Sequence, residues 1–324
     1  MQRRRLILGG AGVLGLGAVA AAAFGWVRRR QGPALPRRVA PLEADAFTAL
    51  YETPLAPPPG PLRVYHLGHS LVARDMPAML AQMAGEGHGH ESQLGWGVAL
   101  REHYEPRLEI RGYESDNAHP RFRPAEDALA SGDYDAFVMT EMVEIRDAIE
   151  WHASPAYVAK WAARARAGRP DVRIYLYETW HQLDDAEGWL DRLDADLERY
   201  WVGTLLREAA TEETGRPIYL IPAGQAMARV VRAAEAGEIE GIAGRDAFFS
   251  DMIHLSDLGA YVVALTHYAT LYQRSPEGLP AALTRADGTP ADAPSPAAAA
   301  ALQRLVWEVV TAEPMTGLAP DLRG

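Results

Sequence analysis

Short apolar runs typical of buried strands alternate with longer segments of helical periodicity through most of this 324-residue chain. Strands are expected at residues 63–67, 134–139, 172–177 and 217–221, with a weaker one at 91–94. Helices are expected at residues 71–84, 125–131, 155–167, 186–213, 224–236, 256–273 and 297–311. Strands that alternate with helices form a parallel sheet covered on both faces. The sequence therefore predicts an α/β fold with three layers.

Length and composition are consistent with one globular domain, expected at residues 62–324. With 48% apolar residues the chain can bury one substantial core. It contains no cysteine, which excludes disulfides, thiol catalysis and cysteine metal sites. The net charge is −11 although residues 1–38 hold eight arginines and no acidic residue, so the rest is still more acidic. Such a body repels phosphate backbones, and no nucleic-acid partner is expected.

The N-terminus has the pattern of an export signal or a membrane anchor, expected at residues 1–30. Three arginines at 3–5 precede an uncharged apolar run at 6–27, and three more follow at 28–30. As a helix this run would be about 33 Å long, enough to cross a bilayer. Its start is similar to a twin-arginine signal, and its small residues suit a signal peptidase. Both readings place the body outside the cytoplasm, as in a periplasm. Residues 31–61 are proline-rich and are expected to form a semi-rigid tether.

One serine and a carboxylate–imidazole pair stand out as groups that nucleophilic catalysis requires. Ser70 follows the first expected strand, and Asp251 and His254 are three residues apart near the other end of the chain. A serine hydroxyl is a weak nucleophile, so a base must take its proton and a carboxylate must hold that base in the correct tautomer. At a strand-to-helix junction, Ser70 would also lie where a helix N-terminus favours negative charge.

Two motifs carry a family resemblance. Gly68-x-Ser70-Leu71 and Asp251-x-Ile253-His254-Leu255-Ser256-x-x-Gly259 resemble the first and last blocks of the SGNH (GDSL-like) hydrolases. The resemblance implies a Ser-His-Asp esterase on a flavodoxin-like three-layer fold. It implies Ser70 as nucleophile, His254 as base and Asp251 as the orienting acid. It also implies an oxyanion hole made by the Ser70 amide, a second-block glycine and a third-block asparagine. Gly97 is the preferred second-block glycine, with Gly95 as the alternative.

The chain departs from this pattern in two places. His69 replaces the aspartate of the first block, and Thr140-Glu141-Met142 follows the third expected strand where the family has an asparagine. Loss of one oxyanion donor costs on the order of 3 kcal/mol of transition-state stabilisation. Thr140, or the indole N–H of Trp180, is the expected replacement.

Other polar and aromatic residues follow expected strands and should line the same cleft, because ligands bind beyond the carboxyl ends of parallel strands. Glu141, Trp180 and His181 are expected to contact the substrate on this ground. The tract at residues 87–91 contains two histidines but lacks a third ligand at suitable spacing, so we interpret it as a surface loop. No metal and no cofactor is expected.

The sequence thus predicts an extracytoplasmic serine esterase that cleaves a small acyl ester, for example acetyl, through an acyl-serine intermediate. By resemblance, O-acetylated glycans or lipids are plausible substrates. Two alternatives stay open. The first is a binding module of the same fold without turnover, which the missing asparagine favours; the second is an O-acyltransferase that acts on a glycan. An uncleaved N-terminal segment would make the membrane a further partner.

Overall fold

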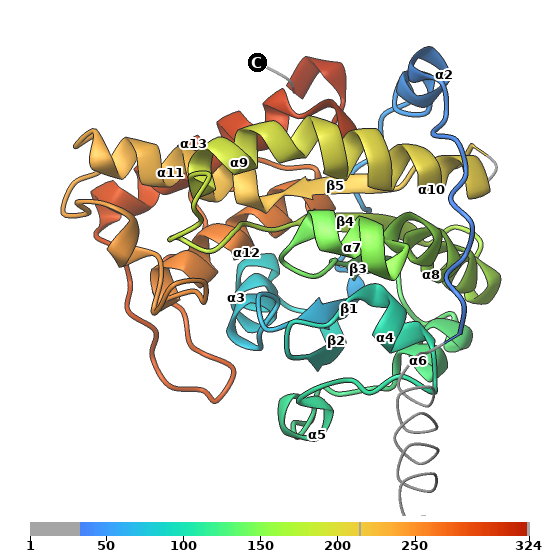
Figure 1. The fold of residues 1–324 in the computed structure, drawn as a ribbon. Coiled ribbons are helices and arrows are strands. Elements are labelled where there is room, and N and C mark those ends of the chain that lie inside the picture. The colour runs from blue at the N-terminus through green and yellow to red at the C-terminus, as the bar shows by residue number, and fades with distance from the viewer. Residues whose placement is uncertain (1–32, 214, 323–324) are drawn as a thin grey trace, which may run out of the picture.

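The centre of the computed structural model, which describes residues 33–213 and 215–322, is a five-stranded parallel sheet (Figure 1). The strands are β1 (Arg63–His69), β2 (Gly89–Gly95), β3 (Ala136–Met139), β4 (Arg173–Glu178) and β5 (Tyr219–Pro222). Their order is β2-β1-β3-β4-β5, and every neighbouring pair is parallel. This is the strand order of flavodoxin-like folds, so the predicted fold class is confirmed.

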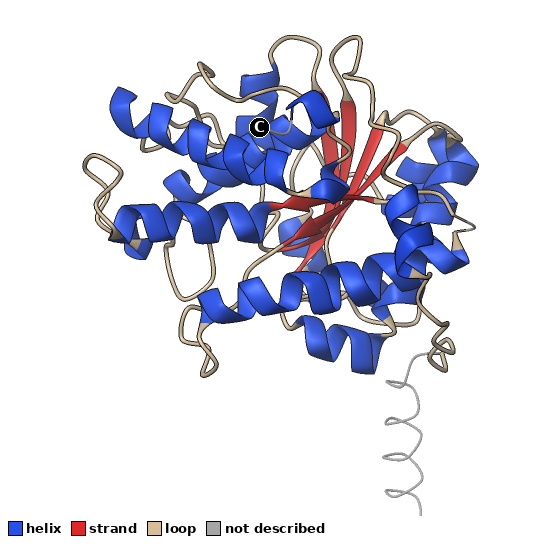
Figure 2. Ribbon diagram, turned by 90° about the horizontal axis from the view of Figure 1, so that it is seen from above, coloured by secondary structure: helices blue, strands red, loops and turns tan. Residues whose placement is uncertain are grey.

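Helices cover both faces of the sheet (Figure 2). On one face α3 (Asp75–Ala84), α11 (Ala223–Glu235), α12 (Asp257–Tyr272) and α13 (Pro296–Ala312) pack against one another. On the other face α8 (Ser154–Gly168) contacts α4 (Leu100–Tyr104), α6 (Ala125–Ser131), α7 (Ile145–His152) and α10 (Arg207–Glu212). Connections between parallel strands are right-handed. The chain goes from β1 to one edge of the sheet, at β2, and then crosses back through β3, β4 and β5 to the other edge. The helices of these two directions therefore lie on opposite faces.

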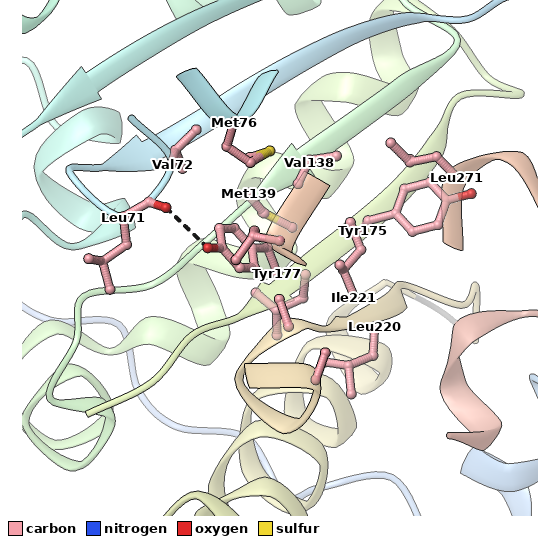
Figure 3. Packing of buried hydrophobic residues seen from close by; sticks show 14 of the residues in the cluster. Leu71, Val72, Met76, Val138, Met139, Tyr175, Tyr177, Leu220, Ile221 and Leu271 are labelled. Carbon is pink, nitrogen blue, oxygen red and sulfur yellow. Dashed lines mark hydrogen bonds between the residues drawn. The ribbon is translucent and has the colours of Figure 1, made fainter. Parts of the chain in front are cut away.

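The core lies between the sheet and these helices and is built from apolar and aromatic side chains that alternate along the strands. Figure 3 shows Tyr175 and Tyr177 of β4 beside Met139 of β3 and Ile221 of β5. All four side chains are completely buried. The two tyrosines place phenol groups in the core, and the Tyr177 hydroxyl donates to the Leu71 carbonyl at 3.1 Å (Figure 3). The packed sheet thereby fixes the turn that follows β1.

The strand order reverses between β1 and β3. At such a switch point the loops that leave neighbouring strands run to opposite faces and leave room for a ligand at their carboxyl ends. Ser70 follows β1 and Thr140 follows β3, so both lie at this point. The topology therefore predicts a ligand site beside Ser70, the residue that the first motif also indicates.

Two expected helices differ in the structure. The helix expected from residue 71 begins at Asp75, because Ala73 has a left-handed backbone (φ 50°) that no helix accommodates. The helix expected at 186–213 consists of α9 (Trp189–Asp196), a π-helical stretch at Leu197–Leu206 and α10. Side-chain periodicity alone does not distinguish these geometries.

The described part of the proline-rich stretch packs on the α/β domain. It contains the short helix α2 (Ala44–Ala49), whose Phe47 is buried. The Leu42 N–H donates to the Arg207 carbonyl at 3.0 Å, and the Tyr51 hydroxyl donates to the Ile218 carbonyl at 2.7 Å. The expected signal or anchor at 1–30 lies outside the described residues. Within 33–213 and 215–322, no helix is long and apolar enough to cross a membrane.

Candidate active site

Ser70 lies in a tight turn directly after β1. The Val72 N–H donates to the His69 carbonyl at 2.9 Å, so Ser70 and Leu71 hold the two central positions of that turn. Gly68 precedes the turn, and a methyl group there would lie 2.5 Å from Cγ2 of Thr140. A glycine at this position therefore permits the close approach of the β1 and β3 ends.

Two buried histidines, His69 and His103, stabilise this turn by hydrogen bonds. The Leu71 N–H donates to Nδ1 of His69 at 3.3 Å, so His69 carries its proton on Nε2, which donates to the Glu141 carbonyl at 2.8 Å. His103 donates from Nε2 to the Gly68 carbonyl at 2.8 Å, while its Nδ1 accepts from the Gln93 amide at 2.9 Å. Burial lowers the pKa of each histidine to about 4. Both rings are therefore neutral at pH 7 and act as fixed donors.

Asp251 and His254 lie in a loop closed by strand-like pairing. Phe249 pairs with Leu255 in an antiparallel bridge, and the Ser250 N–H donates to the His254 carbonyl at 2.8 Å. After the loop, α12 begins with Ser256 as its N-cap, whose side chain accepts from the Gly259 N–H at 3.2 Å. A side chain at Gly259 would meet the Phe248 carbonyl at 2.1 Å, which accounts for glycine at this position of the motif.

Ser70, His254 and Asp251 form a hydrogen-bonded relay. Nδ1 of His254 lies 2.7 Å from Oδ2 of Asp251, and Nε2 lies 3.1 Å from Oγ of Ser70. A carboxylate only accepts, so the proton of the neutral ring is on Nδ1 and the free lone pair of Nε2 faces the serine. Ser70 can then donate its hydroxyl proton to Nε2. The two distant motifs are brought together in the geometry that nucleophilic catalysis requires.

The loop itself keeps Asp251 ionised. Its Oδ1 accepts from the N–H groups of Ile253 at 2.8 Å and His254 at 2.7 Å. These bonds, together with the His254 ring, lower the pKa of Asp251 to about 2. The side chains of Asp251 and His254 are 54% and 46% exposed. The relay is therefore open to water.

Two backbone N–H groups that follow β1 and β2 are candidates for binding a developing oxyanion. His69 pairs with Gly95 at the ends of β1 and β2, so Ser70 and Gly97 leave adjacent strands. Among the described residues, neither the Ser70 N–H nor the Gly97 N–H has a hydrogen-bond partner. Gly97 has φ 54°, which a glycine adopts without strain. Gly95 instead lies within β2, and a side chain there would collide with Ile110 at 2.6 Å.

The structure corrects the expected role of Thr140 in the oxyanion hole. The Thr140 hydroxyl donates to the Tyr177 carbonyl at 2.8 Å, and its N–H donates to the Leu67 carbonyl at 3.0 Å. Its methyl group faces Gly68. Thr140 is therefore a buried residue that joins the ends of β1, β3 and β4, and it has no donor left for a substrate.

Glu141, expected to contact the substrate, is instead completely buried. Its Oε1 accepts from the N–H groups of Leu100 at 3.2 Å and Met142 at 2.7 Å. Burial raises the pKa of Glu141 to about 7. Because its carbonyl also accepts from His69, Glu141 joins the loops that follow β1, β2 and β3.

Trp180 and His181 are also buried behind the site instead of facing it. The Trp180 indole N–H donates to the Ile253 carbonyl at 2.8 Å, so it supports the loop of Asp251 and His254 and is not an oxyanion donor. His181 lies 3.2 Å from Asp196, within a buried ion network centred on Arg192. Burial and the nearby Arg192 charge lower the pKa of His181.

The tract at residues 87–91, expected to be a surface loop, enters the sheet, because residues 89–91 belong to β2. Nδ1 of His88 lies 2.7 Å from the Tyr272 hydroxyl. In the part of the chain that the structure describes, no group of three or more histidine, aspartate or glutamate side chains is arranged to hold a metal ion.

Comparison with known proteins adds information on the fold. No model of a known protein family matches the chain, and no curated protein matches it either. A solved DUF4886 family protein from Bacteroides uniformis ATCC 8492 is 16% identical, with a TM-score of 0.50 over 76% of this chain and 93% of that protein. The two proteins share a fold. A carbohydrate esterase family 3 protein from Talaromyces cellulolyticus is 14% identical, with a TM-score of 0.33 over 65% of this chain and 97% of that protein.

Sequence reasoning missed His103, Gln93 and Tyr177 as supports of the nucleophile turn. His103 looks like a packing residue because it lies on the buried side of a five-residue helix. Its partner Gln93 is ten residues away, and Tyr177 comes from a strand whose apolar pattern indicates only burial. These contacts depend on strand register, which a single sequence specifies poorly.

Proposed function

We propose that this protein is an extracytoplasmic serine esterase that cleaves a small acyl ester through an acyl-serine intermediate. The observation that carries the proposal is the relay of Ser70, His254 and Asp251, whose atoms lie 3.1 and 2.7 Å apart. The resemblance of both motifs to the SGNH hydrolases supports the same activity. The shared α/β fold is compatible with it but hosts many functions.

In the proposed reaction, Oγ of Ser70 attacks the ester carbonyl carbon while its proton passes to Nε2 of His254. The carbonyl oxygen becomes an oxyanion that accepts hydrogen bonds from the Ser70 and Gly97 N–H groups. His254 then donates its Nε2 proton to the leaving alkoxide, and the acyl group remains on Ser70. A water molecule, deprotonated by His254, attacks the acyl-serine, and the acid leaves as Ser70 regains its proton.

Asp251 contributes by its charge and its position. An ionised carboxylate stabilises the imidazolium that forms in each step and keeps the Nδ1 proton in place. Because the pKa of Asp251 is lowered to about 2, this support is present over the whole physiological range. The oxyanion hole of this proposal has two donors, so the rate enhancement should be modest compared with a site of three.

Exposure of the relay favours hydrolysis over acyl transfer. An acyltransferase must exclude water from its acyl-serine, whereas about half of the His254 and Asp251 side chains is open to solvent. The placement outside the cytoplasm rests on the arginine-flanked apolar run at residues 6–27. O-acetylated glycans and lipids are the substrates we propose for that location.

Hydrolysis of an aryl acetate tests the proposal. We expect the wild type to release the phenol and Ser70→Ala to lose at least about a thousandfold in kcat. Ser275→Ala, an exposed serine beyond α12, is the matched control and should keep full activity. A fluorophosphonate should label Ser70 alone, as shown by peptide mass. Equal rates for wild type and Ser70→Ala, or no Ser70 labelling, would contradict the proposal and favour the binding module.

A further inference from the structure

A cavity of about 470 Å³ adjoins the candidate oxyanion glycine. Its lining includes Gly97, Val98 and Met142, which follow β2 and β3. The rest of its lining includes Arg107, Leu108, Glu109 and Arg111, and the Arg111 carbonyl accepts from the Trp96 N–H at 2.7 Å. This volume suits a group the size of one or two sugar rings. Gly97 is the residue of the candidate oxyanion hole that lines this cavity.

Two guanidinium groups of this cavity are free of carboxylate partners. Arg107 and Arg111 line it, are exposed, and form no ion pair with any described residue. The only side-chain hydrogen bond of either arginine to a described residue is from the Arg111 guanidinium to the Gly97 carbonyl at 3.3 Å. Arg192, by contrast, is paired with three different carboxylates. Both guanidinium groups are therefore available to an anion that enters this cavity.

The acidic groups of the cavity leave a positive balance. Glu102 accepts from the Ala99 N–H at 2.9 Å and pairs with Nδ1 of His152 at 3.0 Å, so its charge is met within the protein. Glu109, the other carboxylate of the lining, offsets one of the two arginine charges, so one positive charge remains. Arg101 lies beside His152 and adds a further positive charge, because its amino groups donate to the Trp151 and Pro33 carbonyls instead of to carboxylates.

We infer that the alcohol part of the substrate carries an anionic group, a carboxylate or a phosphate, that binds Arg107 and Arg111 in this cavity. A guanidinium offers parallel N–H donors that match the oxygens of either anion. Because Arg111 also bonds to the Gly97 carbonyl, an anion held there would be coupled to the loop of the oxyanion hole. The inference rests on the proposed esterase activity and specifies its substrate class.

Matched esters test the inference: O-acetylated methyl glucoside, O-acetylated glucuronic acid and O-acetylated glucose 6-phosphate. We expect the wild type to prefer one or both anionic esters over the neutral one by about tenfold or more in kcat/KM, and the better anion identifies the group bound. Arg107→Gln should reduce this ratio of anionic to neutral ester at least about fivefold, and added salt should reduce it in the wild type. Arg199→Gln removes an exposed, unpaired arginine far along the chain and should leave the ratio unchanged.

Binding to the inactive variant gives a readout that does not need turnover. With Ser70→Ala, calorimetry should detect tighter binding of the anionic esters than of the neutral ester, and Arg107→Gln should remove the difference. Equal kcat/KM and equal binding for all three esters would overturn the inference while Ser70-dependent hydrolysis would still support the proposed function. Absence of Ser70-dependent hydrolysis would refute the proposed function itself.

Discussion

Glu141 lies where the three loops of the candidate site meet. Its carboxyl oxygen accepts from Leu100 after β2 and from Met142 after β3, and its carbonyl accepts from His69 at the end of β1. These are the loops that carry the nucleophile and the candidate oxyanion donors. A residue with no solvent contact thereby controls the spacing of groups that would touch the substrate.

Substitution of Glu141 tests this positioning role. Glu141→Gln keeps an acceptor oxygen and should retain kcat within a few-fold. Glu141→Ala leaves the buried Leu100 N–H and the partly buried Met142 N–H without an acceptor, and an unsatisfied buried N–H costs about 1–3 kcal/mol. We expect it to lower kcat for an aryl acetate at least about tenfold with little change in KM. If the glutamine and alanine variants lost equal amounts of kcat while both stayed folded by circular dichroism, the acceptor would have no positioning role.

The loop of Asp251 and His254 is held in place by the loop that follows β4. The Trp180 indole donates to the Ile253 carbonyl at 2.8 Å, and the Leu183 N–H donates to the Met252 carbonyl at 2.9 Å. Trp180 also packs edge-on against Phe249, at 5.9 Å between ring centroids. The position of the His254 ring nitrogen that faces Ser70 therefore depends on a loop whose Trp180 precedes Ile253 by 73 residues.

Trp180→Phe separates the hydrogen bond of this tryptophan from its packing. The variant keeps an aromatic ring but leaves the Ile253 carbonyl without its donor, so His254 should be less well positioned and kcat should fall several-fold. Trp189→Phe is the matched control, since Trp189 also packs edge-on against Phe249 and its indole makes no hydrogen bond with a described residue. The rate of Ser70 labelling by a fluorophosphonate measures the effect. Equal labelling rates in both variants would contradict it.

The elements themselves were largely predictable, and the side-chain roles at their ends were not. All five strands were expected, four from apolar runs and the one at residues 91–94 more weakly, and the order Ser70, Asp251, His254 follows from the motifs. Thr140 and Trp180 were placed correctly after strands, but their donors were assigned to a substrate although they serve the Tyr177 and Ile253 carbonyls. A sequence indicates that a polar group lies at a strand end. Which neighbour satisfies it depends on register and on loops that come from distant segments.

Buried titratable groups throughout the domain make the free energy of unfolding depend on pH. Burial lowers the pKa of five histidines to about 4 and that of His66 further. Below their unfolded pKa of about 6.5, the unfolded chain takes up protons that the folded chain refuses, so stability falls with falling pH. Burial also raises the pKa of Glu141 to about 7 and that of Glu178 to about 8. These carboxyls stay protonated in the folded chain after the unfolded chain has released its protons, so they reduce stability as pH rises.

The balance of these groups predicts a maximum of stability near pH 7. Each proton bound by only one of the two states changes the free energy of unfolding by about 1.4 kcal/mol per pH unit. The six histidines outweigh the two carboxyls below about pH 7, whereas the carboxyls outweigh the histidines between pH 7 and 8. Urea unfolding from pH 4.5 to 9 should show a steep rise, a maximum and a shallow fall. Glu141→Gln should make the fall shallower, and stability that kept rising from pH 7 to 8 would show that these carboxyls are ionised in the folded chain.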